Sequence, residues 1–390
     1  MLKKNWWVLV LFSLSLIFFV AQNVNQRFWL NDFQVYYEAG RHLLAGQNLY
    51  GVFPEDSRPH FVYKYSPLAA ALFVPLSFLP FSLAKILGYW ILVLLLLWFL
   101  NRAYSLFAPD SPARKNWILL ATFLILSPHF QRELHLGQVN LVMLALLLLA
   151  LRTYLNRKSF RTAGLWSICF FLKPQVLLFL PYFLVKRNFR ILAYILPLVL
   201  IGFLVPIIFY GWQMNLNQHQ LWLKELSLQM QGGNLSLAKH NLAGFVSFWL
   251  GLKPYLASHP AVGKFFGLGL TLLVGMLFLV FIQKRVNNFD PALADFAVLL
   301  FLMPLLSVTD SQPFLFGTLA VVLILYHWGK GGISPGEKVF LIVAFLLVGG
   351  NWHDLWGERL FLKWEEVGLL GIGSIMILGY IYVLRMKRTY

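Results

Sequence analysis

Asp32 is the side chain best placed to do chemistry in this 390-residue chain, because it puts a charge just after an apolar run. It lies in the stretch NDFQVYYEAGRHLLAGQNLY (residues 31–50), where apolar or small residues recur at helical spacing. We expect an amphipathic helix that lies in the membrane interface, with its aromatic rings at headgroup depth. A carboxylate at the start of this helix could act as a general base or as an ordinary N-cap, and the spacing favours neither role.

Lys173 is the second candidate, because it precedes Pro174 inside the apolar run 162–185. An ammonium group in an apolar span is costly and usually faces a cavity, a partner or a ligand. The ordinary alternatives are pairing with a carbonyl that Pro174 frees, or snorkelling to the interface. Other cations that could bind an anionic group are Lys64, Arg132, Lys239 and His240.

The segment ELHLGQVN (residues 133–140) places an acid, an imidazole and two amides at the entrance of a predicted span. Gln138 and Asn140 could bind hydroxyl groups of a ligand, but amides near a helix start also cap helices or tie them together. Glu133 and His135 have neither the HExxH spacing nor a comparable metal-ligand spacing, so we expect no metal site there.

Two later segments contribute weaker candidates. The connector 212–240 is rich in Gln and Asn, and Asn234, Lys239 and His240 could border a binding site. A surface loop lying on the membrane is the favoured interpretation of this connector. Asp310 lies between two apolar runs, where it could be a second acid or could cap a helix that begins near Pro313.

Composition places the chain in a membrane. It is 59% hydrophobic and 12% charged, and several apolar runs approach the ~20 residues that cross a bilayer. The net charge of +17 would suggest nucleic acid in a soluble protein, but here basic clusters alternate with acidic connectors. The positive-inside rule then predicts cytoplasmic termini, with Asp32 on the external face of the cell membrane and no nucleic-acid partner. We expect one membrane-embedded domain over residues 1–390, with residues 25–82 as an external loop.

The apolar runs predict an all-α polytopic protein with about 12 crossings. Run 162–185 is expected to form two short helices hinged at Pro174, and 67–80, with its internal prolines, a re-entrant or interfacial helix. The other predicted spans are 6–24, 83–104, 116–128, 139–154, 191–210, 262–283, 292–307, 314–326, 339–350 and 367–383.

Short motifs in the first half of the chain carry a family resemblance. They are NDFQVYY (31–37), GQNLY (46–50), YSPL (65–68) with PL (75–76) and LP (79–80), LGQVN (136–140) and FLKPQ (171–175). Together they resemble glycosyltransferase family 87, a group of GT-C membrane enzymes that includes polyprenol-phosphate-mannose-dependent α-1,2-mannosyltransferases. NLS (234–236) and PLLS (304–307) extend the match weakly. Many relatives carry a histidine or an aromatic pair after the latter element, whereas this chain reads SVTDSQP (307–313).

The resemblance implies a GT-C-type helical bundle whose active site faces away from the cytoplasm. It implies a polyprenyl-phosphate sugar donor, with mannose favoured, and a glycan or glycolipid acceptor. It implies no cofactor and leaves the need for a divalent metal open. Asp32 would be the base, and the candidate phosphate contacts are Lys173, Lys64, Lys239 and His240. Candidate sugar or acceptor contacts are Tyr36, Tyr37, Arg41, Tyr65, Glu133, His135, Gln138, Asn140, Gln175, Asn234 and Asp310.

A single carboxylate suits this chemistry. A glycosidase pairs two carboxylates because an alcohol leaving group must be protonated. A polyprenyl phosphate leaves as a stabilised anion, so one base on the acceptor and cations on the phosphate suffice, and direct displacement inverts the anomeric carbon. The alternative from another class is a transporter or flippase for a lipid-linked or small solute, with Lys173-Pro174 marking a broken helix at its substrate site. A non-catalytic assembly or polysaccharide-export subunit is a third possibility.

Overall fold

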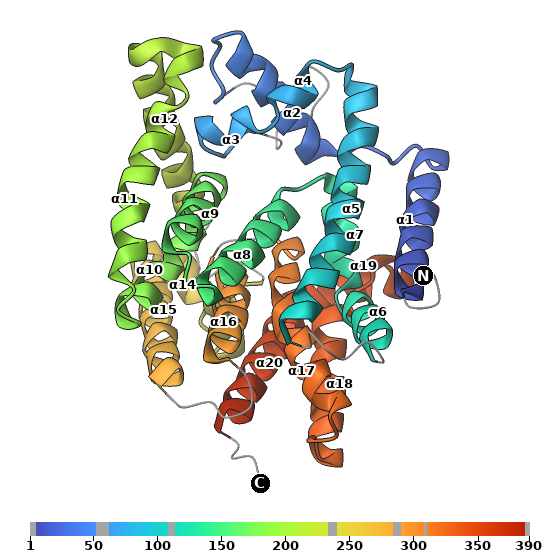
Figure 1. Ribbon diagram of the computed structural model, residues 1–390. Coiled ribbons are helices and arrows are strands. Elements are labelled where there is room, and N and C mark those ends of the chain that lie inside the picture. The colour runs from blue at the N-terminus through green and yellow to red at the C-terminus, as the bar shows by residue number, and fades with distance from the viewer. Residues whose placement is uncertain are drawn as a thin grey trace. The chain divides into compact units, whose positions relative to one another are not determined.

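Hydrophobic runs separated by short polar connectors fold here as helices, because a backbone in lipid must satisfy its own hydrogen bonds. A computed structural model describes residues 5–51, 62–107, 114–232, 240–283, 290–307 and 310–386, and all regular structure in these ranges is helical (Figure 1). The all-α prediction is therefore confirmed for the described part of the chain.

The helices of the first half are α1 (Trp6–Val24), α2 (Asn31–Leu44), α3 (Pro67–Ala71), α4 (Val74–Ser77), α5 (Phe81–Phe107), α6 (Lys115–Ile125), α7 (Ser127–Leu136), α8 (Asn140–Leu155), α9 (Ser159–Leu172), η2 (Pro174–Leu178) and α10 (Phe179–Val185). Those of the second half are α11 (Phe189–Leu204), α12 (Ile207–Gly232), α13 (Leu242–Trp249), α14 (Lys253–Ser258), α15 (Pro260–Gln283), α16 (Pro291–Leu305), η3 (Gln312–Gly317), α17 (Thr318–Gly329), α18 (Pro335–Gly349), α19 (His353–Val367) and α20 (Leu369–Met386).

Several of these helices are long and apolar enough to cross a membrane. By length and composition the described residues supply five such spans, α1, α5, α15, η3 with α17, and α20. Two bent pairs, α7 with α8 at 117° and α11 with α12 at 96°, raise the number to seven if each pair is one span. Shorter apolar helices are α6, α16 and the segment Pro174–Val185. The chain is an integral membrane protein.

The contacts divide the chain into two compact units. One unit comprises residues 10–99 and 132–231, and the other comprises residues 1–9, 100–131 and 232–390. In the second of these, α16 is buried from Ala292 to Leu305. Arg385 of α20 pairs with Asp295 of α16, and its guanidinium lies 4.2 Å from the centre of the Phe281 ring. A buried charge needs such a partner, so this pair ties α20 to α16.

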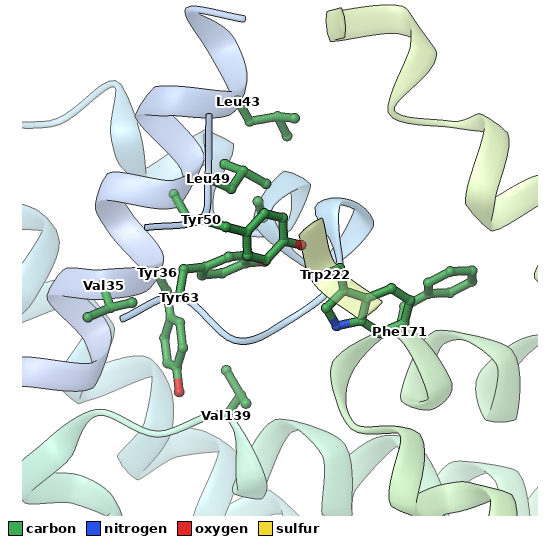
Figure 2. Close-up of a cluster of buried hydrophobic side chains, with 11 residues drawn as sticks. Val35, Tyr36, Leu43, Leu49, Tyr50, Tyr63, Val139, Phe171 and Trp222 are labelled. Carbon is green, nitrogen blue, oxygen red and sulfur yellow. The ribbon is translucent and has the colours of Figure 1, made fainter. Parts of the chain in front are cut away.

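In the unit of residues 10–99 and 132–231, α3 and α4 pack against α2 (Figure 1). Gly40 allows the close approach, because a Cβ at this position would lie 2.3 Å from Ser77 Oγ and 3.0 Å from the Phe73 carbonyl carbon. Residues of α2 also join a buried cluster that draws on several segments (Figure 2). Its members are Val35, Tyr36, Ala39, Leu43, Leu49, Tyr50, Tyr63, Ala70, Val139, Phe171 and Trp222. The region that positions Asp32 therefore has a hydrophobic core of its own.

The connector 212–240 differs from the sequence prediction. Residues 207–232 are helical, with a break in the backbone at Gly211, and Trp222 is buried against Phe170 and Phe171. The prediction of a surface loop was wrong for this part, because the amides that suggested a loop lie on the same helix as a core tryptophan. Residues 233–239, which include Asn234 and Lys239, lie outside the described residues.

Replacing Gly40 by alanine tests the packing of α2 on α4. Alanine normally stabilises a helix interior relative to glycine by about 1 kcal/mol, but here its methyl group would meet the Phe73 backbone and Ser77. We expect overpacking that costs about 1–3 kcal/mol, measured as a lower melting temperature in detergent. Gly269→Ala on α15 is the matched control, because a Cβ there meets nothing within 4 Å. Equal melting temperatures for the two variants would contradict the proposed close approach.

Candidate active site

The turn between α7 and α8 brings the predicted site residues together. Gly137 has φ +68°, in the left-handed region that favours glycine, and a Cβ there would lie 2.6 Å from Phe33 Cβ and 3.2 Å from Leu30 Cδ2. The missing side chain lets the turn rest on the start of α2. The consequence is that Gln138, the next residue, reaches Asp32 although about 100 residues separate them in sequence.

Asp32 lies in the first turn of α2, where the positive end of the helix dipole favours a carboxylate. The N-cap position of α2 is occupied by Leu30, and no side chain makes a capping hydrogen bond there. Asp32 is therefore not the N-cap that the sequence spacing allowed. Its Oδ2 accepts a hydrogen bond from Gln138 Nε2. Gln138 Oε1 in turn accepts from the Tyr36 hydroxyl at 2.9 Å and the Tyr65 hydroxyl at 3.4 Å.

The orientation of the Gln138 amide follows from its neighbours. A carboxylate only accepts hydrogen bonds, so the nitrogen end must face Asp32, and the oxygen end then receives the phenol protons. Burial holds the pKa of Tyr36 well above its usual range, with Tyr65 and Asp32 adding to the effect. Burial likewise raises the pKa of Tyr65. Both phenols therefore stay protonated at ordinary pH and remain available as donors.

Asn140 forms the corresponding contacts two residues further along. Its Nδ2 donates to Glu133 Oε2 at 2.8 Å, and its Oδ1 accepts from Lys173 Nζ. Glu133 Oε1 accepts from the backbone N–H of Leu141 at 2.8 Å. The Lys173 ammonium also lies 5.9 Å from the centre of the Tyr65 ring. One short turn thus contacts both the candidate base and the candidate cation.

Ser66, which was not among the predicted site residues, ties the segment that carries Tyr65 to the end of α9, just before Lys173. Ser66 Oγ donates to the Phe171 carbonyl at 2.8 Å, and the Ser66 side chain also caps α3 by accepting from Ala69 N at 3.1 Å. Lys173 itself is extended (φ −146°, ψ 112°), as a residue before proline should be. The Ser-Pro pair at the start of a helix is a recognised capping signal and could have identified Ser66.

Other predicted contacts in this unit have different surroundings. The Tyr37 hydroxyl donates to the Leu79 carbonyl at 2.7 Å, and Arg41 is exposed and lies 3.6 Å from Glu38. The His135 ring contacts Gln22 Oε1 at 2.8 Å. Lys64 and Gln175 are exposed. None of these five belongs to the hydrogen-bond network around Gln138 and Asn140 that the structure records, and their roles stay predictions.

His240 and Asp310 belong to the other unit, where the structure brings them to the same place. His240 is buried, and its Nε2 lies 3.6 Å from Glu365 Oε1 and 4.0 Å from Asp310 Oδ1. Asp310 Oδ1 also accepts from the N–H of the next residue, Ser311, at 2.7 Å. The residue that precedes η3 is Ser311, so Asp310 is not the N-cap of the helix near Pro313. Within the described ranges, no group of three or more His, Cys, Asp or Glu side chains is arranged to hold a metal ion.

Comparison with known proteins decides the family. The model of glycosyltransferase family 87 matches residues 63–308. The chain belongs to glycosyltransferase family 87. This family 87 protein is also similar to a solved structure, the crystal structure of ArnT from Cupriavidus metallidurans bound to undecaprenyl phosphate. The two are 13% identical, the similarity covers 97% of this chain and 78% of that chain, and the TM-score is 0.46. No curated protein matches the sequence significantly.

The matched region of this family 87 protein contains most of the network. Tyr65, Glu133, Gln138, Asn140 and Lys173 lie within residues 63–308, whereas α2, which carries the candidate base, precedes them. The contacts to α2 therefore extend the candidate site beyond the matched residues.

Gly137→Ala tests whether the turn must rest on α2. The added methyl group would collide with Phe33 Cβ, and alanine is strained at φ +68°, so Gln138 should move away from Asp32. A misplacement of 1 Å can cost about 100-fold in rate, and we expect a loss of this order in sugar transfer per folded enzyme. Gly164→Ala on α9, where a Cβ meets nothing within 4 Å, should keep the wild-type rate. An undiminished rate in Gly137→Ala would refute the positioning role of this turn.

Proposed function

We propose that this chain is a membrane glycosyltransferase that moves a sugar, mannose favoured, from a polyprenyl-phosphate donor to an acceptor hydroxyl. The acceptor would be a glycan or glycolipid, and the reaction would take place on the non-cytoplasmic face of the cell membrane. Membership of glycosyltransferase family 87 supports the reaction class. The integral membrane character of the chain suits a lipid-carried donor.

The observation that carries the proposal is the pairing of a carboxylate and a cation across one turn. Asp32 is held by Gln138, and Lys173 is held by Asn140. A transfer from a phosphate carrier needs these two groups: a base for the acceptor proton and a positive charge for the leaving phosphate. It needs no acid on the leaving group, which agrees with a network that offers the substrate a single carboxylate, since Glu133 is buried.

In the proposed reaction, Asp32 takes the proton of the acceptor hydroxyl as the oxygen attacks the anomeric carbon. The bond between that carbon and the phosphate oxygen breaks, and the polyprenyl phosphate leaves with the electron pair. Lys173 stabilises the negative charge that develops on the phosphate, and the proton on Asp32 is later released to solvent. The attack comes from the face opposite the leaving group, so the configuration inverts.

Asp32→Asn tests the base. Asparagine keeps an oxygen that can accept from Gln138 but cannot take a proton, so transfer should fall by about 10²–10⁴-fold with little change in donor KM. The measurement uses membranes with labelled polyprenyl-phosphate sugars and a panel of acceptors. Glu38→Gln, on the same helix and paired only with exposed Arg41 among the recorded ion pairs, is the matched control and should keep its rate. Wild-type-like transfer by Asp32→Asn would contradict the proposal, and vesicle uptake of the labelled donor that survives this substitution would favour transport.

Lys173→Met tests the phosphate contact. Loss of the ammonium should raise the donor KM by roughly 10-fold or more, because a charge-assisted contact to the phosphate disappears. Lys64→Met is the comparison, because Lys64 is an exposed lysine beside Tyr65. We expect a smaller rise in donor KM than for Lys173→Met, because Lys64 lies outside the recorded network around Asn140. The reverse pattern, with only Lys64→Met affecting the donor, would move the phosphate site away from Lys173.

A further inference from the structure

Glu133 is a buried carboxylate that the proposed reaction does not use. Its side chain has no exposure to solvent, so it cannot reach a substrate as Asp32 could. Both of its oxygens accept hydrogen bonds, one from the Asn140 amide and one from the backbone N–H at the start of α8. A carboxylate buried in this way is expensive and calls for a compensating positive charge.

That positive charge is Lys173, two hydrogen bonds away. Asn140 bridges the two groups, with its nitrogen end on Glu133 and its oxygen end on Lys173. This orientation is the only one that the chemistry permits, because a carboxylate only accepts and an ammonium only donates. If Asn140 turned over, each end would face a group of its own kind. Glu133 therefore determines which way the amide points, and the amide determines where the ammonium is held.

We infer that Glu133 is a positioning residue that holds Lys173, through Asn140, for the phosphate of the donor. This inference rests on the proposed function, and it names a residue that affects how the same site binds the donor. In this role Glu133 would not be the direct sugar contact that the family resemblance implied, since its side chain has no exposure to solvent.

The two amides of this segment contact different groups of the proposed site. Gln138 contacts the base and should affect the chemical step, whereas Asn140 contacts the cation and should affect donor binding. A Lys173 ammonium that is held in place loses less side-chain entropy when it meets a phosphate, which is the gain expected from preorganisation. Glu133 thus acts on donor affinity without touching the donor.

Glu133→Gln separates this role from a structural one. Glutamine offers one acceptor and one donor end, whereas both present partners of Glu133, Asn140 Nδ2 and Leu141 N, are donors. One contact must fail, or Asn140 must turn its own donor end toward Lys173. We expect the donor KM, with a labelled polyprenyl-phosphate sugar, to rise roughly 10-fold while kcat per folded enzyme changes little. A merely structural role would reduce the amount of folded enzyme and leave its donor KM unchanged.

A double-mutant cycle with Lys173→Met shows whether Glu133 acts through the lysine. Once the ammonium is removed, Glu133→Gln should have no further effect on donor KM. If the two substitutions have additive effects, or if Lys173→Met raises the donor KM and Glu133→Gln does not, the inference is overturned while the proposed function stands. If the wild type transfers no sugar from any polyprenyl-phosphate donor, both fail.

Asn140→Ser is a second variant that tests the inference if Glu133→Gln does not fold. Serine is too short to bridge Glu133 and Lys173, so it should give the same rise in donor KM and the same lack of effect in the Lys173→Met background. A donor KM equal to that of the wild type in Asn140→Ser would overturn the inference that Asn140 links Glu133 to Lys173.

Discussion

The hydrogen bond from the Gln138 amide to Asp32 is the contact on which the site depends, because it joins two segments that are far apart in the chain. It forms only because Gly137 has no side chain, which lets the α7–α8 turn rest on Phe33 and Leu30. The Asp32 carboxylate only accepts, so it fixes the orientation of the amide, and the tyrosine hydroxyls donate to the amide oxygen. The carboxylate is thus linked to Tyr36 and Tyr65 through a single amide, whose nitrogen end faces Asp32 and whose oxygen end faces the phenols.

The pairing of hydrogen-bond donors with acceptors also explains how a cation and two carboxylates can lie among apolar side chains. A buried charge is tolerated when its hydrogen-bonding capacity is filled by groups of the right kind. Glu133 and Lys173 meet this condition through one asparagine, and Asp32 meets it through one glutamine. Two amides separated by one residue therefore hold a carboxylate and a cation at fixed places, which is the arrangement that the proposed transfer from a phosphate carrier requires.

Much of the local structure could be predicted from sequence, and the long-range contacts could not. The run 6–24 predicted α1 to the residue, the amphipathic spacing after Asn31 predicted α2, and Lys173-Pro174 predicted the interruption after α9. These signals are local, since periodicity and proline act within one element. Which way the amide of Gln138 or Asn140 points depends on partners up to 106 residues away, and no local pattern encodes it. The burial of Trp222 was missed for the same reason: surrounding amides suggested a loop, whereas tertiary packing placed its helix in the core.

A structure with a bound, non-transferable phosphonate analogue of a polyprenyl-phosphate sugar would test the central claim most directly. The account predicts a phosphonate oxygen within hydrogen-bond distance of Lys173 Nζ, roughly 3 Å, and the Asp32 carboxylate on the side of the anomeric carbon opposite the phosphonate. A phosphonate bound away from Lys173, or an Asp32 that faces the leaving group, would contradict it.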